Sequence, residues 1–229
     1  MVMNSCGVAQ SAESRAVSTH VAGSIPAPAA APDPRPMFTI ERDSLPSVFE
    51  VAQEYDLRSL PTYKEPRILD LGANFGVFSW MALQVWPGAS SRAYEPNPVT
   101  FDHLVRNTAF MKVDPVRAAV TRSKGHIRLN DGARNSLCCS TVDRGDQDME
   151  HGWIVETVAA LDLPPCDILK CDTAGTEVDV FETYPHLAGV KCVLVECHSD
   201  EAFRKVQAIC TANGLLLLDR RDNTLRFVR

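Results

Sequence analysis

The sequence predicts an α/β fold whose core is one doubly wound, mostly parallel sheet of seven strands that ends in an antiparallel C-terminal hairpin. Short apolar segments of strand length alternate with segments of helical periodicity. A glycine-rich turn follows the first apolar segment. The last two strand-like segments have the pattern of a hairpin. Ligands of such sheets bind at the carboxyl ends of the strands, so functional residues are expected there.

The first half of the fold follows a regular alternation. We expect helices over residues 44–59 and 77–86 and strands over residues 67–71 and 92–95. The second helix stops at Pro87-Gly88. A third helix follows, with Asn97 as its N-cap and Pro98 at its first position.

The second half is regular at its end and irregular in its middle. We expect strands over residues 116–121, 167–172 and 190–197, helices over 176–184 and 200–213, and a hairpin of 215–218 and 224–228. Residues 123–160 show only strand-like pieces, at 126–129 and 136–140.

Residues 1–36 form a separate segment, and the folded domain is expected over 37–229. The segment contains eight Ala, five Pro and five Ser but no Leu, Phe, Tyr or Trp, so it is expected to be a disordered tail. Gly23-Ser-Ile-Pro26 is the translation of GGT TCG ATT CCC, the T-arm sequence of a transfer RNA gene. An upstream-start artefact, with Met37 as the natural start, is one explanation; a real disordered extension is the other.

Composition narrows the function classes. The net charge of −6 offers no bulk field for nucleic-acid phosphates, so no nucleic-acid partner is expected. No stretch approaches the ~20 apolar residues of a membrane span. None of the eight cysteines forms a Cys-x-x-Cys pair, and most lie in apolar runs. We therefore expect buried thiols, a reducing compartment and a cytoplasmic protein.

The turn after the first strand has the spacing of a cofactor-binding motif. It reads Asp70-x-Gly72-x-x-x-Gly76, where Gly72 can bring the backbone close to a ligand and Gly76 lets a helix pack closely. Asn74 occupies a position where the dinucleotide fingerprint needs glycine. The spacing resembles motif I of class I S-adenosylmethionine-dependent methyltransferases. Glu95, at the end of the next strand, could accept both hydroxyl protons of a ribose.

Several motifs together resemble the FkbM family of methyltransferases. The matching segments are Ile68–Phe78, Tyr94–Pro98, Asp167–Asp172 with Gly175 and Glu177, and Val195–His198. The resemblance implies a Rossmann-like class I methyltransferase fold, S-adenosylmethionine as cofactor, and methylation of a hydroxyl on a sugar, glycan or natural product. It also implies a cofactor pocket shaped by Asp70, Gly72, Ala73, Asn74, Gly76, Glu95, Pro96 and Asn97. Ala174 stands where the family has a glutamate, so a role of that glutamate cannot be transferred.

Candidate catalytic residues follow the fourth and fifth strands. Asp172 is expected beside the methyl position, while Glu196 and His198 lie two residues apart and share a side of their strand end. An alcohol nucleophile needs a proton acceptor, and we assign that role to Asp172 or His198. Glu196 would orient its partner or bind substrate. We expect no metal, because histidine is not a preferred ligand of Mg²⁺.

Two other functions stay open. A nucleic-acid methyltransferase is one, although the Asp/Asn-Pro-Pro-aromatic box of adenine amino-methylation is absent after the fourth strand. A non-catalytic cofactor-binding domain is the other, supported only by Ala174. The leading expectation is an enzyme with a small-molecule or glycan acceptor.

Overall fold

The computed structural model describes residues 45–130 and 152–229. The chain divides into two units, Met1–Arg35 and Pro36–Arg229, and all that follows concerns the second. The expected tail over 1–36, the boundary at 36/37 and the strand-like piece at 136–140 lie outside the described residues.

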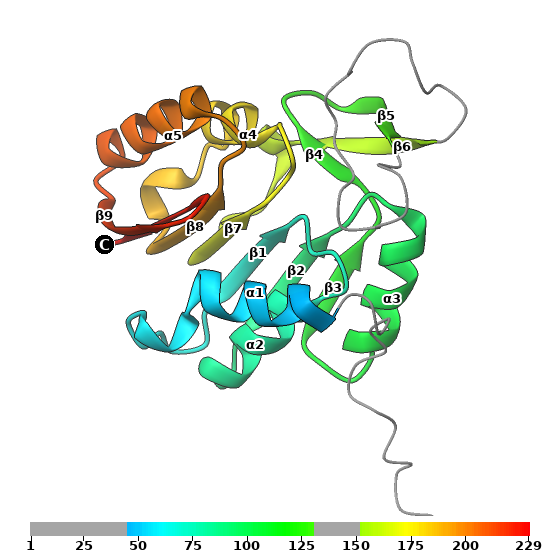
Figure 1. The fold of residues 1–229 in the computed structure, drawn as a ribbon, viewed down its shortest axis with the longest axis horizontal. Helices are drawn as coiled ribbons and strands as arrows, with labels where there is room; N and C mark the ends of the chain where they lie inside the picture. The colour runs from blue at the N-terminus through cyan, green and yellow to red at the C-terminus, as the bar shows by residue number, and fades with distance from the viewer. Residues whose placement is uncertain (1–44, 131–151) are drawn as a thin grey trace, which may run out of the picture. The chain divides into compact units, whose positions relative to one another are not determined.

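A seven-stranded sheet forms the centre of the domain, in the order β3-β2-β1-β7-β8-β10-β9 (Figure 1). Its strands are β1 (Arg67–Leu71), β2 (Ser90–Tyr94), β3 (Val113–Val116), β7 (Ile168–Cys171), β8 (Cys192–Glu196), β9 (Leu216–Arg221) and β10 (Thr224–Val228). All neighbouring pairs are parallel except those of β10, which runs antiparallel to β8 and β9. The predicted doubly wound sheet with its C-terminal hairpin is confirmed.

Helices cover both faces of this sheet. They are α1 (Leu45–Tyr55), α2 (Val77–Val85), α3 (Pro98–Thr108), α4 (Glu177–Thr183) and α5 (Asp200–Ala212). Figure 1 shows α1, α2 and α3 on one face and α4 and α5 on the other. The core divides in the same way: Ile68 packs with Phe78 of α2, whereas Leu69 packs with Val206 of α5. Successive side chains of β1 therefore serve opposite layers, as expected for a strand buried on both faces.

The predicted third strand, 116–121, is wrong as a single element. The chain leaves the main sheet after Val116, turns with an Ala118 N–H to Val116 carbonyl bond of 3.1 Å, and enters a second sheet as β4 (Ala119–Thr121). That three-stranded sheet has the order β4-β6-β5, with β5 over Gly125–Asn130 and β6 over Gly152–Ala159. Because both strands contain apolar residues, the sequence run does not reveal where the chain changes sheets.

The C-terminal hairpin is joined to the end of α1 by a buried arginine. Arg226 is 1% exposed and forms two bonds of 2.6 Å with the Asp219 carboxylate. Its Nη1 donates to the Tyr55 carbonyl at 3.0 Å. The predicted helix over 44–59 ends in this region, because Asp56 takes a left-handed conformation with φ 36° before a short 3₁₀ turn, Leu57–Ser59.

The cysteines that the structure describes are buried and form no disulfide, as expected for small apolar residues. They are Cys166, Cys171, Cys192, Cys197 and Cys210. Across residues 45–130 and 152–229, no helix has the length and apolar character needed to cross a bilayer.

Candidate active site

Close backbone contacts require glycine in the turn after β1. Gly72 has φ +77°, and a Cβ at this position would stand 1.8 Å from the Asp172 carbonyl oxygen. The Gly72 and Ala73 amides both donate to the Tyr94 carbonyl at 2.9 Å. The turn thus touches the ends of β2 and β7, and only a residue without a side chain fits there.

Glu95 anchors this turn from the end of β2. Its Oε2 accepts from the Asn74 N–H at 2.8 Å, and its Oε1 accepts from the Asn97 N–H at 2.8 Å and the Thr100 hydroxyl at 3.0 Å. Burial raises the pKa of Glu95, although these hydrogen bonds act in the opposite direction. Since each carboxylate oxygen has two lone pairs, one acceptor position stays open on Oε2. The Glu95 carboxylate thus keeps an acceptor position for a ligand donor, and its binding of both ribose hydroxyls stays a prediction.

A cavity lies at the carboxyl ends of β1, β2 and β7. Its lining consists of Gly72, Asn74, Tyr94, Glu95, Pro96, Ala118, Ala119, Val120, Leu129, Asp172, Thr173, Ala174 and Thr176. Four predicted cofactor residues line it: Gly72, Asn74, Glu95 and Pro96. The buried side-chain oxygen of Asn74 has no hydrogen-bond partner among the described residues. A polar acceptor with no internal partner suits a site that receives a ligand donor.

The other four predicted cofactor residues support the cavity from behind. Asp70 is fully buried and accepts from the Ser79 hydroxyl at 2.7 Å. Ala73 packs in the core against α3. Gly76, at φ +84°, begins α2, and a Cβ there would lie 2.8 Å from a Leu104 methyl group. Asn97 caps α3, accepting from the Val99 N–H at 2.9 Å; the predicted cap and close helix packing are confirmed.

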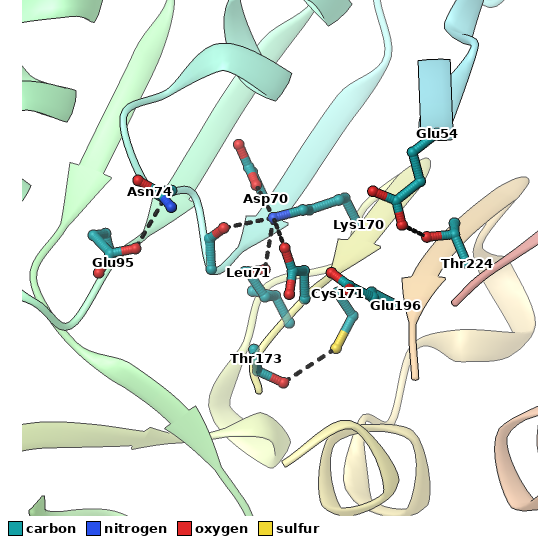
Figure 2. A network of polar contacts seen from close by, with 12 residues as sticks. Glu54, Asp70, Leu71, Asn74, Glu95, Lys170, Cys171, Thr173, Glu196 and Thr224 are labelled. Atoms are coloured by element: carbon teal, nitrogen blue, oxygen red, sulfur yellow. Dashed lines mark hydrogen bonds and ion pairs between the residues drawn. The ribbon is translucent and has the colours of Figure 1, made fainter. Parts of the chain in front are cut away.

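Carboxylates gather beside the cavity, at the ends of β7 and β8. Asp172, Glu196 and His198 each present a possible ligand atom within 4.8 Å of the others. Glu54 of α1 approaches the same group and accepts from the Thr224 hydroxyl (Figure 2). Burial, followed by the nearby Asp172, raises the pKa of Glu196 to about 8. The closeness of these three side chains does not by itself identify a metal site, and the expectation that no metal is bound stays a prediction.

The contacts of His198 favour its protonated form. Its Nδ1 lies 2.8 Å from Oε1 of the buried Glu177, and its Nε2 lies 3.8 Å from Glu196. The hydrogen bond to Glu177 raises the pKa of His198 to about 9, against the opposing effect of burial. A histidine that is protonated at neutral pH cannot accept a proton. The geometry therefore favours Asp172 over His198 as the proton acceptor.

Lys170 is a site residue that sequence reasoning missed. It lies on β7, is 3% exposed, and its Nζ donates to the Gly72 carbonyl at 2.5 Å. Figure 2 shows this ammonium between Asp70 and the turn. The available signal was a lysine inside an otherwise apolar strand, between Asp167 and Asp172. Such a charge is rarely buried unless it is paired.

Ala174, which stands where the FkbM family has a glutamate, also belongs to the cavity. Ala174 lines it and has φ +48°, a backbone conformation that L residues rarely adopt. The neighbouring Gly175 N–H donates to Glu177 at 2.8 Å, so the loop after β7 is joined to the pair of Glu177 and His198.

Comparison with known proteins finds two methyltransferase relatives. A hexuronic acid methyltransferase from Haloferax volcanii is 27% identical over 173 residues, which cover 69% of this chain and 63% of the relative. The methyltransferase sdnD from Sordaria araneosa is 46% identical over 55 residues, which cover 24% of this chain and 20% of the relative. The chain thus spans less than two thirds of either relative. No family profile matches, so the FkbM resemblance is not confirmed.

The solved structures that resemble this chain include a precorrin-6y C5,15-methyltransferase from Geobacter metallireducens. Its TM-score is 0.48 at 12% identity, over 83% of this chain and 92% of that one. The fold assignment depends on the strand order and on the single antiparallel strand β10. These are the sheet order and hairpin of the class I methyltransferases, with a cavity at the switch point of the sheet. The chain has the class I methyltransferase fold.

Proposed function

We propose that this chain transfers a methyl group from S-adenosylmethionine to a hydroxyl on a sugar, glycan or natural product. One observation carries the proposal: the cavity joins the glycine turn and Glu95 on one side to Asp172 on the other. A cofactor site and a proton acceptor therefore adjoin in one cavity. The relative described as a hexuronic acid methyltransferase supports a sugar hydroxyl as acceptor. The motifs quoted above favour FkbM membership as part of this proposal.

The chain offers unsatisfied acceptors to the cofactor. The open position on Glu95 Oε2 and the unpartnered Asn74 oxygen can take hydroxyl or ammonium protons of a nucleoside amino acid. When bound, S-adenosylmethionine supplies an electrophilic methyl group on a sulfonium. Gly72 and Pro96 complete this side of the cavity, whereas Asp70, Ala73, Gly76 and Asn97 act by fixing the turn and the start of α3.

On the acceptor side, Asp172 takes the proton that the hydroxyl loses. Glu196, whose pKa is raised to about 8, holds a proton at neutral pH and can donate a hydrogen bond to Asp172 or to a substrate oxygen. His198, fixed by Glu177, contributes positive charge at the same edge. Correct placement of the hydroxyl accounts for most of the expected rate enhancement.

The acceptor is expected to be a small molecule or glycan rather than a nucleic acid. A net charge of −6 and several carboxylates at the cavity edge oppose a polyanion. The buried thiols of the described residues, which form no disulfide, fit a reducing, cytoplasmic setting.

Calorimetry with S-adenosylhomocysteine, followed by a screen of hydroxylated acceptors, tests the proposal. Asp172→Asn should retain cofactor affinity and lose turnover by about 100-fold or more, the size of a general-base contribution. Asp114→Asn, at an exposed ion pair with Arg92, is the matched control and should behave as wild type. Absence of cofactor binding would refute the proposal, whereas binding without turnover on any acceptor would favour the non-catalytic domain.

A further inference from the structure

Lys170 brings a positive charge to the back of the glycine turn. Its Nζ lies 2.5 Å from the Gly72 carbonyl oxygen and 3.3 Å from the Leu71 carbonyl oxygen. The side chain is 4% exposed, and the rings of Tyr55 and Phe78 lie 6.0 Å from the ammonium. Water therefore offers this ammonium few alternative partners, so its contacts with the turn are strong and specific.

Two carboxylates compensate this charge. Asp70 Oδ1 lies 3.3 Å and Asp172 Oδ2 lies 3.7 Å from Lys170 Nζ. Although burial acts to lower the pKa of Lys170, the attraction of Asp70 and Asp172 raises it, so the side chain stays charged. Asp70 is fully buried behind the turn and Asp172 lines the cavity. The Lys170 ammonium thus lies between Asp70, buried behind the turn, and Asp172, which lines the cavity.

The backbone of the turn is held from two neighbouring strands. The Gly72 and Ala73 amides donate to the Tyr94 carbonyl of β2, and the Gly72 carbonyl accepts from Lys170 of β7. The peptide group that joins Gly72 to Ala73 is therefore fixed through both its N–H and its C=O. This orientation also presents the next amide, that of Asn74, to Glu95.

We propose that Lys170 is a positioning residue that holds the Gly72 carbonyl and so keeps the cofactor turn in its binding conformation. The inference rests on the proposed function, because it treats this turn as the binding surface for S-adenosylmethionine. Asp70 retains Lys170 in place rather than contacting the cofactor. This explains why a fully buried aspartate belongs to the motif although it does not line the cavity.

The test removes the lysine without leaving a buried charge unpaired. Lys170→Met alone would leave the buried Asp70 carboxylate without its cation, so the principal variant combines Lys170→Met with Asp70→Asn. Two control variants lie away from the turn. Lys191→Met removes a lysine that precedes β8 and is paired to Asp167 at the surface, and Gly214→Ala strains the chain beyond α5.

Calorimetry with S-adenosylhomocysteine should show affinity reduced roughly 10- to 100-fold in the double variant, as expected from losing one charged hydrogen bond that holds the site. The two controls should stay within about twofold of wild type, since they change stability or surface charge alone. A folded double variant that binds within about threefold of wild type would overturn the proposal.

Amide hydrogen exchange, measured by NMR without ligand, separates this proposal from the proposed function. The Gly72 and Ala73 amides should exchange at least about tenfold faster in the double variant, while the amides of β8 keep their wild-type rates. A uniform increase in exchange would indicate a purely structural lysine and overturn the proposal. If wild type itself fails to bind S-adenosylhomocysteine, the proposed function fails, and exchange at these two amides still decides whether Lys170 holds the turn.

Discussion

Substitution of Gly72 by alanine probes the contact that defines the candidate site. A Cβ at Gly72 would meet the Asp172 carbonyl oxygen at 1.8 Å, far inside the ~3.5 Å of an ordinary nonbonded contact. The φ of +77° adds the left-handed strain of about 1–2 kcal/mol. Because the blocking atom is backbone of the loop after β7, relief requires the turn and this loop to separate. Such overpacking costs a further ~1–3 kcal/mol or more. Together these two costs lead us to expect that Gly72→Ala lowers the free energy of unfolding by about 2–5 kcal/mol.

Gly214→Ala provides a matched comparison. Gly214 has nearly the same φ, +80°, but a Cβ there meets only the end of the flexible Arg229 side chain, at 3.2 Å. Its cost should therefore be limited to the strain of about 1–2 kcal/mol. Urea denaturation under reducing conditions measures both values. Cofactor affinity should fall only in Gly72→Ala. Equal losses of stability in the two variants would refute the reasoning, because the backbone contact would then contribute nothing.

Three further predictions concern stability and charge. Arg226→Met should lower the free energy of unfolding by about 2–3 kcal/mol, mainly because the buried Tyr55 carbonyl loses its donor; Asp219→Asn, at a half-exposed position, should cost less in the same denaturation assay. Thermal unfolding should show stability falling as pH rises from about 5 to 9. The folded pKa of Glu196, about 8, and that of His198, about 9, both exceed their ordinary values, so the folded state binds more protons across this range. Glu196→Gln should flatten the part of this decline below pH 8, and an unchanged slope would contradict the raised pKa. Glu177→Gln should move the NMR titration of His198 down toward its ordinary pKa, since its largest stabilising contact is lost; an unmoved titration would exclude that contact as the cause.

Features encoded by neighbouring residues could be predicted from the sequence. Asn97 followed by Pro98 predicts a helix start, because the cap requires only a side-chain oxygen and a nearby amide. Gly72 and Gly76 were identified from the Asp-x-Gly-x-x-x-Gly spacing, and both have a positive φ, which glycine tolerates best. The sheet followed from strand-length apolar segments alternating with amphipathic helices, as the observed order bears out.

Packing reversed some of these expectations. The i, i+3, i+4, i+7 spacing of Phe101, Leu104, Val105 and Thr108 predicts one buried helix face, yet Val105 is 39% exposed and Asn107 is buried. The Asn107 amide donates to the Phe75 carbonyl at 2.8 Å, a partner 32 residues away. The run over 116–121 was divided between two sheets for a related reason: pairing partners, rather than local hydrophobicity, determine where a strand ends.

The sequence by itself predicted the fold class, the glycine turn after β1 and the group of Asp172, Glu196 and His198 at neighbouring strand ends. These depend on periodicity, glycine and the rule that parallel strands end at one edge. Only the tertiary structure showed that the pKa values of Glu196 and His198 are raised and that the buried Lys170 contacts the turn. A pKa and a buried ion pair depend on charges within a few ångströms, and these come from residues far apart in sequence. Glu177 and His198 are 21 positions apart, and Lys170 and Gly72 are 98 apart. Local patterns therefore predicted where the candidate site lies, whereas the contacts and charges around each side chain depend on residues distant in sequence.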